Sequence, residues 1–223
     1  MKIEAIDHRI FSLTERLGLL KDLSFYLSGG TGLSLQIGHR KSFDLDFFTS
    51  SLFYPEELSG LLKKEGLPVE NEIRSTLTLH CILDGVKTSF IYYSEPLLFK
   101  TIPFNSIQIA DWRDIVVEKL RTIAERGQKK DFYDFYFGVR LLGIEETTRL
   151  VYKKFARKVN YLHLLKGLVY FEDAERSPEP LLLGESPSWD EVKDFFVKNV
   201  QAFERAFLSL KQSTVASVRD ENE

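Results

Sequence analysis

Residues 24–48 of this 223-residue chain read SFYLSGGTGLSLQIGHRKSFDLDFF, in which two apolar stretches are separated by a glycine pair and a polar loop. The pattern predicts strands over residues 24–28 and 43–48, because both stretches are short, apolar and bounded by turn formers. Gly29-Gly30 ends the first strand. The apolar residues within residues 31–38 alternate as in a strand, yet two strands joined by Gly-Gly would leave little room for the next element. We therefore expect a short helix there, and the resulting order indicates an α/β layer.

Asp44 and Asp46 occupy alternate positions of the second predicted strand, so both carboxylates should leave the same face while Leu45 and Phe47 point into the core. Two neighbouring anions repel each other unless a cation lies between them. Hard oxygen ligands with open positions suit Mg²⁺ that carries a substrate triphosphate. The alternative interpretation is a solvent-exposed strand face, which is the commoner origin of an isolated Asp-x-Asp pair.

The turn at Gly29-Gly30-Thr31, upstream of the acids, weakens that alternative. At a strand-to-helix turn, glycine lets the backbone approach a phosphate, and unpaired N–H groups of the helix start face the ligand. Arg40 and Lys41 lie in the loop before the acidic strand and could neutralise a triphosphate, although basic residues before a strand are common. The combination indicates nucleotide binding, and we expect Gly30→Val to lower NTP affinity more than stability.

The rest of the chain divides into a mixed first part and a helical second part. In the first part we expect a helix over residues 5–22, a helix from Pro55 to about Glu65, and a hairpin of strands 76–83 and 86–93 around Asp84-Gly85. In the second part we expect helices over residues 112–126, 131–143, 145–158, 160–171 and 188–211, with Asp111, Asp131 and Ser188 as N-terminal caps. The predicted fold is α+β, with an α/β domain over residues 1–108, a helical domain over 109–211 and a flexible tail over 212–223.

Residues 27–48 resemble the first two motifs of nucleotidyltransferases of the AbiEii/AbiGii toxin group, within the DNA polymerase β-like superfamily. The stretch matches the pattern GG-T-A-L followed by H-R-x-S-x-D-h-D-F-F, where h is apolar, with Gly32 where alanine is usual. A later stretch, from Lys119 to Phe135, is similar to that group's K-h … A … R … R/K-D-x-x-D-h motifs. The resemblance covers most of residues 25–140. It implies a polymerase β-like domain with a mixed sheet flanked by helices, followed by a helical domain.

The resemblance also implies roles for individual residues. Asp44 and Asp46 would be catalytic metal ligands, and the nucleotide would be bound by Ser28, Gly29, Gly30, Thr31, Arg40, Lys41 and Ser42. Lys119 would contact nucleotide phosphates and Asp131 would assist substrate or base positions. Both have ordinary alternatives, since a lysine beside Glu118 is often solvated and an acid at a helix start is often a cap. Asp134, one turn beyond, could pair with Lys130.

A third carboxylate, which polymerase β-like enzymes often carry on a later strand, is missing from residues 86–93. If no other acid takes its place, the acceptor hydroxyl lacks a general base, a group that contributes roughly 10²–10⁴-fold to a rate. Metal binding could survive this loss.

The charge of the chain is unevenly distributed. The net charge is −3, yet residues 119–166 hold 12 Lys and Arg against 5 Asp and Glu. Either the group Lys153, Lys154, Arg157 and Lys158 contacts RNA phosphates, or these residues form a solvated helix face. The aromatic residues within 132–137 should be mainly helical core, with one exposed tyrosine available to stack on a base.

Several classes of protein are excluded or disfavoured. The single Cys81 excludes an internal disulfide, the N-terminus lacks the order of a signal peptide, and no apolar run reaches the ~20 residues that span a bilayer. A cytoplasmic location without membrane contact is expected. Scattered histidines without cysteine clusters disfavour a zinc site, and the absence of Gly-x-Ser-x-Gly disfavours a serine hydrolase.

The leading expectation is a Mg²⁺-dependent or Mn²⁺-dependent nucleotidyltransferase that moves NMP from NTP to a hydroxyl and releases pyrophosphate. By the resemblance, the acceptor would be tRNA or other RNA, and an antitoxin protein would be the partner. Two alternatives stay open. The acceptor could be a small molecule or protein, or the chain could bind nucleotide with little turnover.

Overall fold

A computed structural model describes residues 1–155 and 158–220, with side chains described as far as Gln212. Its contacts divide the chain into two compact units. Met1–Ile115 and Leu181–Gly184 form the first, called here the sheet unit, and Val116–Pro180 with the residues from Glu185 onward forms the second, called the helical unit. Helix α5 (Trp112–Arg126) begins in the sheet unit and continues in the helical unit.

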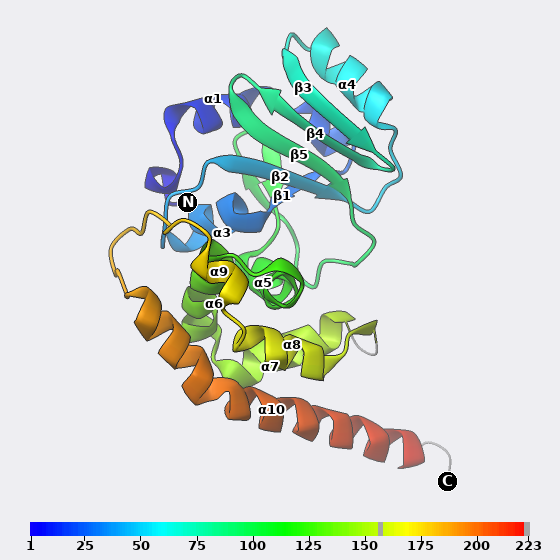
Figure 1. Cartoon of the computed structure of the whole chain (residues 1–223). Helices are drawn as coiled ribbons and strands as arrows, with labels where there is room; N and C mark the ends of the chain where they lie inside the picture. Colours follow the sequence, from blue (N-terminus) through cyan, green and yellow to red (C-terminus); the bar gives the residue numbers. More distant parts are fainter. Residues whose placement is uncertain (156–157, 221–223) are drawn as a thin grey trace. The chain divides into compact units, whose positions relative to one another are not determined.

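The strands of the described residues form one mixed sheet in the order β3-β4-β5-β2-β1-β7-β6. Figure 1 shows β3, β4, β5, β2 and β1 in this order. Their bounds are β1 Tyr26–Ser28, β2 Asp44–Thr49, β3 Val69–Ser75, β4 Thr78–Leu83, β5 Val86–Tyr92, β6 Ile102–Phe104 and β7 Ile107–Ile109. Strand β2 lies in the middle, antiparallel to β1 and parallel to β5. The predicted hairpin is confirmed, since Asp84 and Gly85 both have positive φ, as a tight turn between β4 and β5 requires.

The helical segments of the sheet unit, apart from α5, are η1 (Ile3–Ala5), α1 (His8–Arg16), α2 (Leu19–Asp22), α3 (Gly29–Ile37) and α4 (Pro55–Lys64). The short helix expected after the glycine pair and the helix that begins at Pro55 are confirmed. The single helix predicted over residues 5–22 is wrong. The chain breaks between α1 and α2 at Leu17 and Gly18, and this break lets both Leu17 and Leu20 enter the core with no exposed surface.

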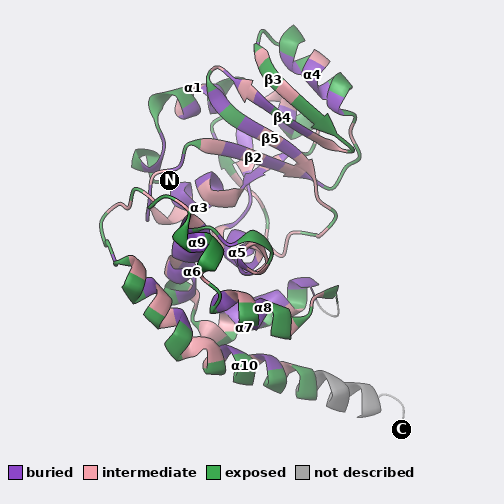
Figure 2. Ribbon diagram, in the orientation of Figure 1, coloured by how far each residue is buried: buried purple, intermediate pink, exposed green. Residues whose placement is uncertain are grey.

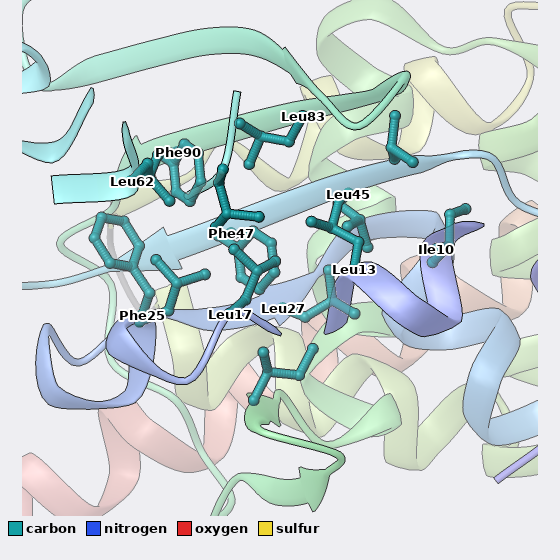
Figure 3. Close-up of a cluster of buried hydrophobic side chains, with 14 of the residues drawn as sticks. Ile10, Leu13, Leu17, Phe25, Leu27, Leu45, Phe47, Leu62, Leu83 and Phe90 are labelled. Carbon is teal, nitrogen blue, oxygen red and sulfur yellow. The ribbon is translucent and has the colours of Figure 1, made fainter. Parts of the chain in front are cut away.

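The core of the sheet unit lies on one face of the sheet. Ile10 and Leu13 of α1 and Leu62 of α4 pack in one cluster with Leu45 and Phe47 of β2 (Figure 3). Burial along β2 alternates between half-buried and buried positions (Figure 2), so its two faces are distinct. The other face of β2 is therefore available to polar side chains.

The helical unit contains α6 (Lys129–Leu142), α7 (Ile144–Phe155), α8 (Tyr161–Leu168), α9 (Glu172–Glu175) and α10 (Trp189–Asp220), besides the later part of α5. Helix α10 packs against α6, α7 and α8. The core of the helical unit is aromatic. The ring centroid of Phe135 on α6 lies 5.8 Å from that of Phe196 and 6.0 Å from that of Phe203, both on α10. Within the described residues, no helix has the length and apolar character needed to cross a membrane.

Several predicted helix ends in this unit are confirmed and others are wrong. The capping box at Ser188 and Glu191 is present, with the Ser188 N–H donating to the Glu191 carboxylate at 2.7 Å. Asp111 caps α5 by accepting the Arg113 N–H at 2.9 Å. The last helix does not end at Lys211 but continues to Asp220. The helix expected over residues 160–171 ends at Leu168 and is followed by the separate turn of α9.

Candidate functional site

The acidic strand has the geometry that its alternation predicts. Asp44 and Asp46 are half-buried on one face of β2, whereas Leu45 and Phe47, on the other face, have no exposed surface. The apolar residues anchor the strand in the core, and this packing fixes the direction of both carboxylates. Asp44 and Asp46 are therefore the residues of the sheet unit that could hold a divalent cation.

The neighbours of this pair on the adjacent strands explain why no third acid joins it. On β5, Lys87 pairs with Asp44 and Ser89 pairs with Asp46, so the strand positions beside the acids carry a cation and a hydroxyl. The Ser89 hydroxyl lies 3.1 Å from Nδ1 of His80 on β4. Among the described residues there is no group of three His, Cys, Asp or Glu that could hold a metal ion. A cation here would rely on two carboxylates and on oxygens of substrate and water, a ligand set that suits Mg²⁺.

The glycine turn lies directly against the acidic strand. Ser28, at the end of β1, is the strand partner of Asp46, and Gly29 follows with φ +62°. A Cβ atom at Gly29 would lie 2.9 Å from Oδ2 of Asp46. Glycine is thus required twice at this position, for its left-handed backbone and for the space that the Asp46 carboxylate occupies.

Gly30 makes room for a second functional side chain. A Cβ atom at Gly30 would lie 2.1 Å from a terminal guanidinium nitrogen of Arg40, so the guanidinium covers the glycine backbone. Arg40 is 4% exposed, and another of its guanidinium nitrogens donates to the Lys41 carbonyl at 2.9 Å. Thr31, in the first turn of α3, donates its hydroxyl to the Asp44 carbonyl and lies 2.7 Å from the Ser42 hydroxyl. The turn, the loop and the acidic strand are thereby held together.

The start of α3 offers N–H groups to a ligand. The first N–H groups of a helix have no partner within the helix, and α3 has no acid in its first turn. Among the described residues, no side-chain bond from Ser28 caps this helix. The site thus combines two carboxylates, a guanidinium and helix N–H groups, which are groups that can bind a metal ion and the phosphates of a ligand.

A segment distant in sequence supports the loop that carries Arg40. The Lys41 N–H donates to the Leu181 carbonyl at 2.7 Å, and the Leu183 N–H donates to the His39 carbonyl at 2.9 Å. These bonds form an antiparallel bridge between Arg40 and Leu182. Sequence reasoning missed this segment, because backbone hydrogen bonds leave no mark on residue type.

Lys119 and Asp131 lie in the helical unit, where the structure brings them together with Asp134. The Lys119 ammonium is 2.6 Å from Oδ1 of Asp131 and 2.6 Å from Oδ2 of Asp134, and the three side chains are 8%, 6% and 0% exposed. The solvated alternative for Lys119 is therefore wrong, and Asp134 pairs with a basic residue, Lys119. Asp131 is not the N-cap of α6; it is the third helical residue, and it accepts the N–H of the N-cap Gln128 at 3.2 Å.

The basic segment is less exposed than its composition suggests. Lys154, expected to face RNA or solvent, is 5% exposed, and its ammonium lies 3.0 Å from the Glu118 carboxylate. Lys153 and Lys158 are exposed, and Arg157 lies outside the described residues. The tyrosines of α6 are buried as well, Tyr133 at 2% and Tyr136 at 9% exposure, so the predicted exposed stacking tyrosine is not on this helix.

Cys81 has the properties of a core residue. It is 5% exposed, and burial, assisted by the charge of Glu72, raises the pKa of its thiol to about 12. A thiol with that pKa carries almost no thiolate at neutral pH and is a poor nucleophile.

Comparisons with known proteins show the family of this chain. A family model for the nucleotidyl transferase AbiEii toxin of type IV toxin–antitoxin systems matches residues 81–209. An uncharacterized protein of Aquifex aeolicus (strain VF5) is 39% identical over 197 residues, which cover 84% of this chain and 90% of that protein. The resemblance inferred from the motifs is confirmed by the family match.

Solved structures share the fold. The structure of JHP933 from Helicobacter pylori has a TM-score of 0.52 and 17% identity, and the match covers 93% of this chain and 95% of that one. MenT4, a nucleotidyltransferase toxin from Mycobacterium tuberculosis H37Rv, has a TM-score of 0.50 and 17% identity, with coverage of 89% and 91%. The predicted α+β class, a mixed sheet with flanking helices followed by helices, is confirmed.

Proposed function

We propose that this chain, which belongs to the AbiEii family of nucleotidyl transferase toxins, transfers a nucleoside monophosphate from an NTP to a hydroxyl of RNA and releases pyrophosphate. The observation that carries the proposal is the contact between the acidic strand and the glycine turn, where Asp46 lies against Gly29 and Arg40 covers Gly30. We favour tRNA as the acceptor and the cytoplasm as the location.

The residues of the sheet unit have separate tasks in this mechanism. Asp44 and Asp46 would hold the Mg²⁺ or Mn²⁺ ion that accompanies the triphosphate. The N–H groups at Gly30 and Thr31 and the guanidinium of Arg40 bind the β- and γ-phosphates and stabilise the charge that develops on them. Ser28 and Ser42 fix the turn from either side, and Lys41 adds a positive charge beside it. When bound, the cation polarises the α-phosphate and lowers the pKa of the attacking hydroxyl.

The transfer balances without any further reactant. The hydroxyl oxygen forms a bond to the α-phosphorus, the bond from that phosphorus to the bridging oxygen breaks, and the electron pair leaves with pyrophosphate. The hydroxyl proton passes to water. The family motif implies that Lys119 and Asp131 also contribute to the transfer, and we propose this role for them.

A second candidate function is nucleotide binding with little turnover, and Ser89 favours it. The strand position beside Asp46 carries this hydroxyl instead of a carboxylate, so a strong base beside the pair is missing there. Binding of NTP without release of pyrophosphate would identify this function.

The test is transfer of label from each α-³²P NTP to the RNA, protein and small-molecule fractions of a cell extract. Label should enter RNA with the wild-type chain and be absent with Asp44→Asn or Asp46→Asn. Glu70→Gln, which removes an exposed carboxylate from β3 of the same sheet, is the matched control and should transfer as wild type does. Unchanged transfer and unchanged Mg²⁺ dependence in both aspartate variants would refute the site, whereas label only in the protein or metabolite fraction would refute the RNA acceptor.

We also propose an antitoxin protein as partner, because the family is described as part of type IV toxin–antitoxin systems. Expression of the chain should then arrest growth, and co-expression of the neighbouring gene should relieve the arrest. Arrest that depends on Asp44 would tie the effect to transfer, and normal growth on expression would contradict a toxin.

A further inference from the structure

The helical unit contains a cavity separate from the residues discussed above. It has a volume of about 510 Å³ and lies between the end of α5, the helix α8 and the residues that follow α8. Sites for small organic ligands span roughly 300–1,000 Å³, so this cavity is large enough for one nucleotide.

Part of the cavity lining is made of small residues. Ala124 of α5, Gly127 directly after α5 and Gly167 of α8 line the cavity. A Cβ atom at Gly167 would lie 2.6 Å from the Cα of Ala124, so α8 and α5 meet there through their backbones. This close packing fixes the position of α8 against α5 beside the cavity.

Two cations on the cavity wall differ from most of the basic segment. Most described cations of residues 119–166 are held in ion pairs, namely Lys119, Arg121, Lys129, Arg140, Arg149 and Lys154. Arg126 and Lys166, which line the cavity and are exposed, form no ion pair with any described residue. Two acids also line it. Glu125 is neutralised by Arg121 at 2.8 Å, which leaves Asp173 to offset the two cations.

An exposed aromatic ring completes the cavity wall. Tyr170 lines the cavity and is 54% exposed, and its hydroxyl donates to the Glu172 carboxylate at 2.9 Å. This bond restricts the orientation of the ring. An exposed ring next to cations is the arrangement with which proteins bind single-stranded nucleic acid, by stacking on bases and by contacting phosphates.

We propose that this cavity binds a nucleotide of the RNA acceptor strand, with its base on Tyr170 and its phosphates on Arg126 and Lys166. The proposal rests on the proposed function, since it assigns a binding site to the RNA acceptor. It places the RNA contact at the end of α5 and on α8, and not on the face formed by Lys153, Lys154, Arg157 and Lys158.

The test measures the binding of a short fluorescein-labelled single-stranded RNA by anisotropy over a series of KCl concentrations. The variant Arg126→Gln/Lys166→Gln should lower the slope of log affinity against log salt by about 1.4, because each lost phosphate contact of single-stranded RNA accounts for about 0.7. Tyr170→Leu should weaken binding about tenfold without changing the slope, since stacking is not electrostatic. Lys153→Gln/Arg205→Gln is the matched control: it removes two exposed cations of the helical unit that do not line the cavity, and it should bind as wild type does.

Each other outcome overturns the proposal. Equal slopes and affinities in the cavity variant and wild type would show that RNA binds elsewhere, while the proposed transfer to RNA would stand. Equal losses in the cavity variant and the control would show a diffuse charge effect and no site. Absence of RNA binding by the wild type, together with transfer of label to another fraction, would refute the RNA acceptor and the cavity site together. Unchanged melting temperatures will establish that all variants are folded.

Discussion

Replacing Lys119 with methionine tests whether the buried ion pairs of the helical unit are structural, catalytic or both. Its ammonium lies 2.6 Å from one oxygen of Asp131 and 2.6 Å from one oxygen of Asp134, and none of these side chains is more than 8% exposed. Lys119→Met leaves two carboxylates buried without this cation, and breaking a buried ion pair costs about 3–5 kcal/mol. For a chain of this size 1 kcal/mol corresponds to a shift of about 2–4 °C, so the melting temperature should fall by roughly 6–20 °C.

Circular dichroism during heating measures this change, and a compensated variant separates stability from activity. Lys119→Met/Asp131→Asn/Asp134→Asn has no charge left in the cluster, and the amide oxygen introduced by Asp131→Asn can still accept the Gln128 N–H, so most of the lost stability should return. Transfer activity should not return if Lys119 or Asp131 contacts the nucleotide. Recovery of both stability and activity would show that the two residues are structural alone.

The control for Lys119→Met is a lysine on the surface of the same unit. Lys153→Met removes an exposed lysine from the same unit and should change stability by less than about 0.5 kcal/mol. A melting temperature of Lys119→Met within the range of this control would refute the buried cluster.

Three further predictions concern the sheet unit. Gly30→Val should displace the Arg40 guanidinium, because the new Cβ would occupy its place. NTP affinity measured by calorimetry should therefore fall as far as in Arg40→Gln, and an affinity equal to that of the wild type would refute this displacement. Ser89→Asp places a third carboxylate beside Asp46 and should tighten Mn²⁺ binding about tenfold in titrations followed by electron paramagnetic resonance, and unaltered binding would argue against a metal on this face. Cys81, whose pKa is raised to about 12, should react with a thiol reagent at pH 8 far more slowly in the folded chain than in urea; equal rates would contradict its burial.

The features that the sequence predicts correctly are those with local causes. The alternation of apolar and acidic residues gives β2 and the direction of its carboxylates, and Asp84-Gly85 gives the hairpin by its backbone preference alone. The strands that it missed have no such signal. β3 (Val69–Ser75) is largely polar and exposed, and β6 and β7 are three residues each, so pairing with neighbouring strands defines them.

Long-range contacts account for the errors at individual residues. Lys154 looks like a surface lysine by composition, but a carboxylate of Glu118, distant in sequence, accompanies it into the interior. Leu181–Gly184 lies within residues 177–187, a stretch whose prolines predict a linker, yet it is part of the sheet unit and holds the loop of Arg40 by its backbone. In both cases the deciding partner lies tens of residues away, beyond any periodicity or capping signal.

The sequence gives only one of the two reasons for the glycines of the turn. The sequence interpretation assigns Gly29 and Gly30 to the approach of a phosphate to the backbone. The structure adds that the missing side chains leave space for the Asp46 carboxylate and the Arg40 guanidinium. Loss of activity in a glycine variant therefore does not by itself demonstrate phosphate contact, because the variant also moves a side chain for which we propose metal or phosphate binding. If Gly30→Val and Arg40→Gln both act by removing the Arg40 guanidinium from its place, the NTP affinity of the double variant should be no lower than that of either single variant. Additive losses of NTP affinity would assign the phosphate contact to the backbone itself.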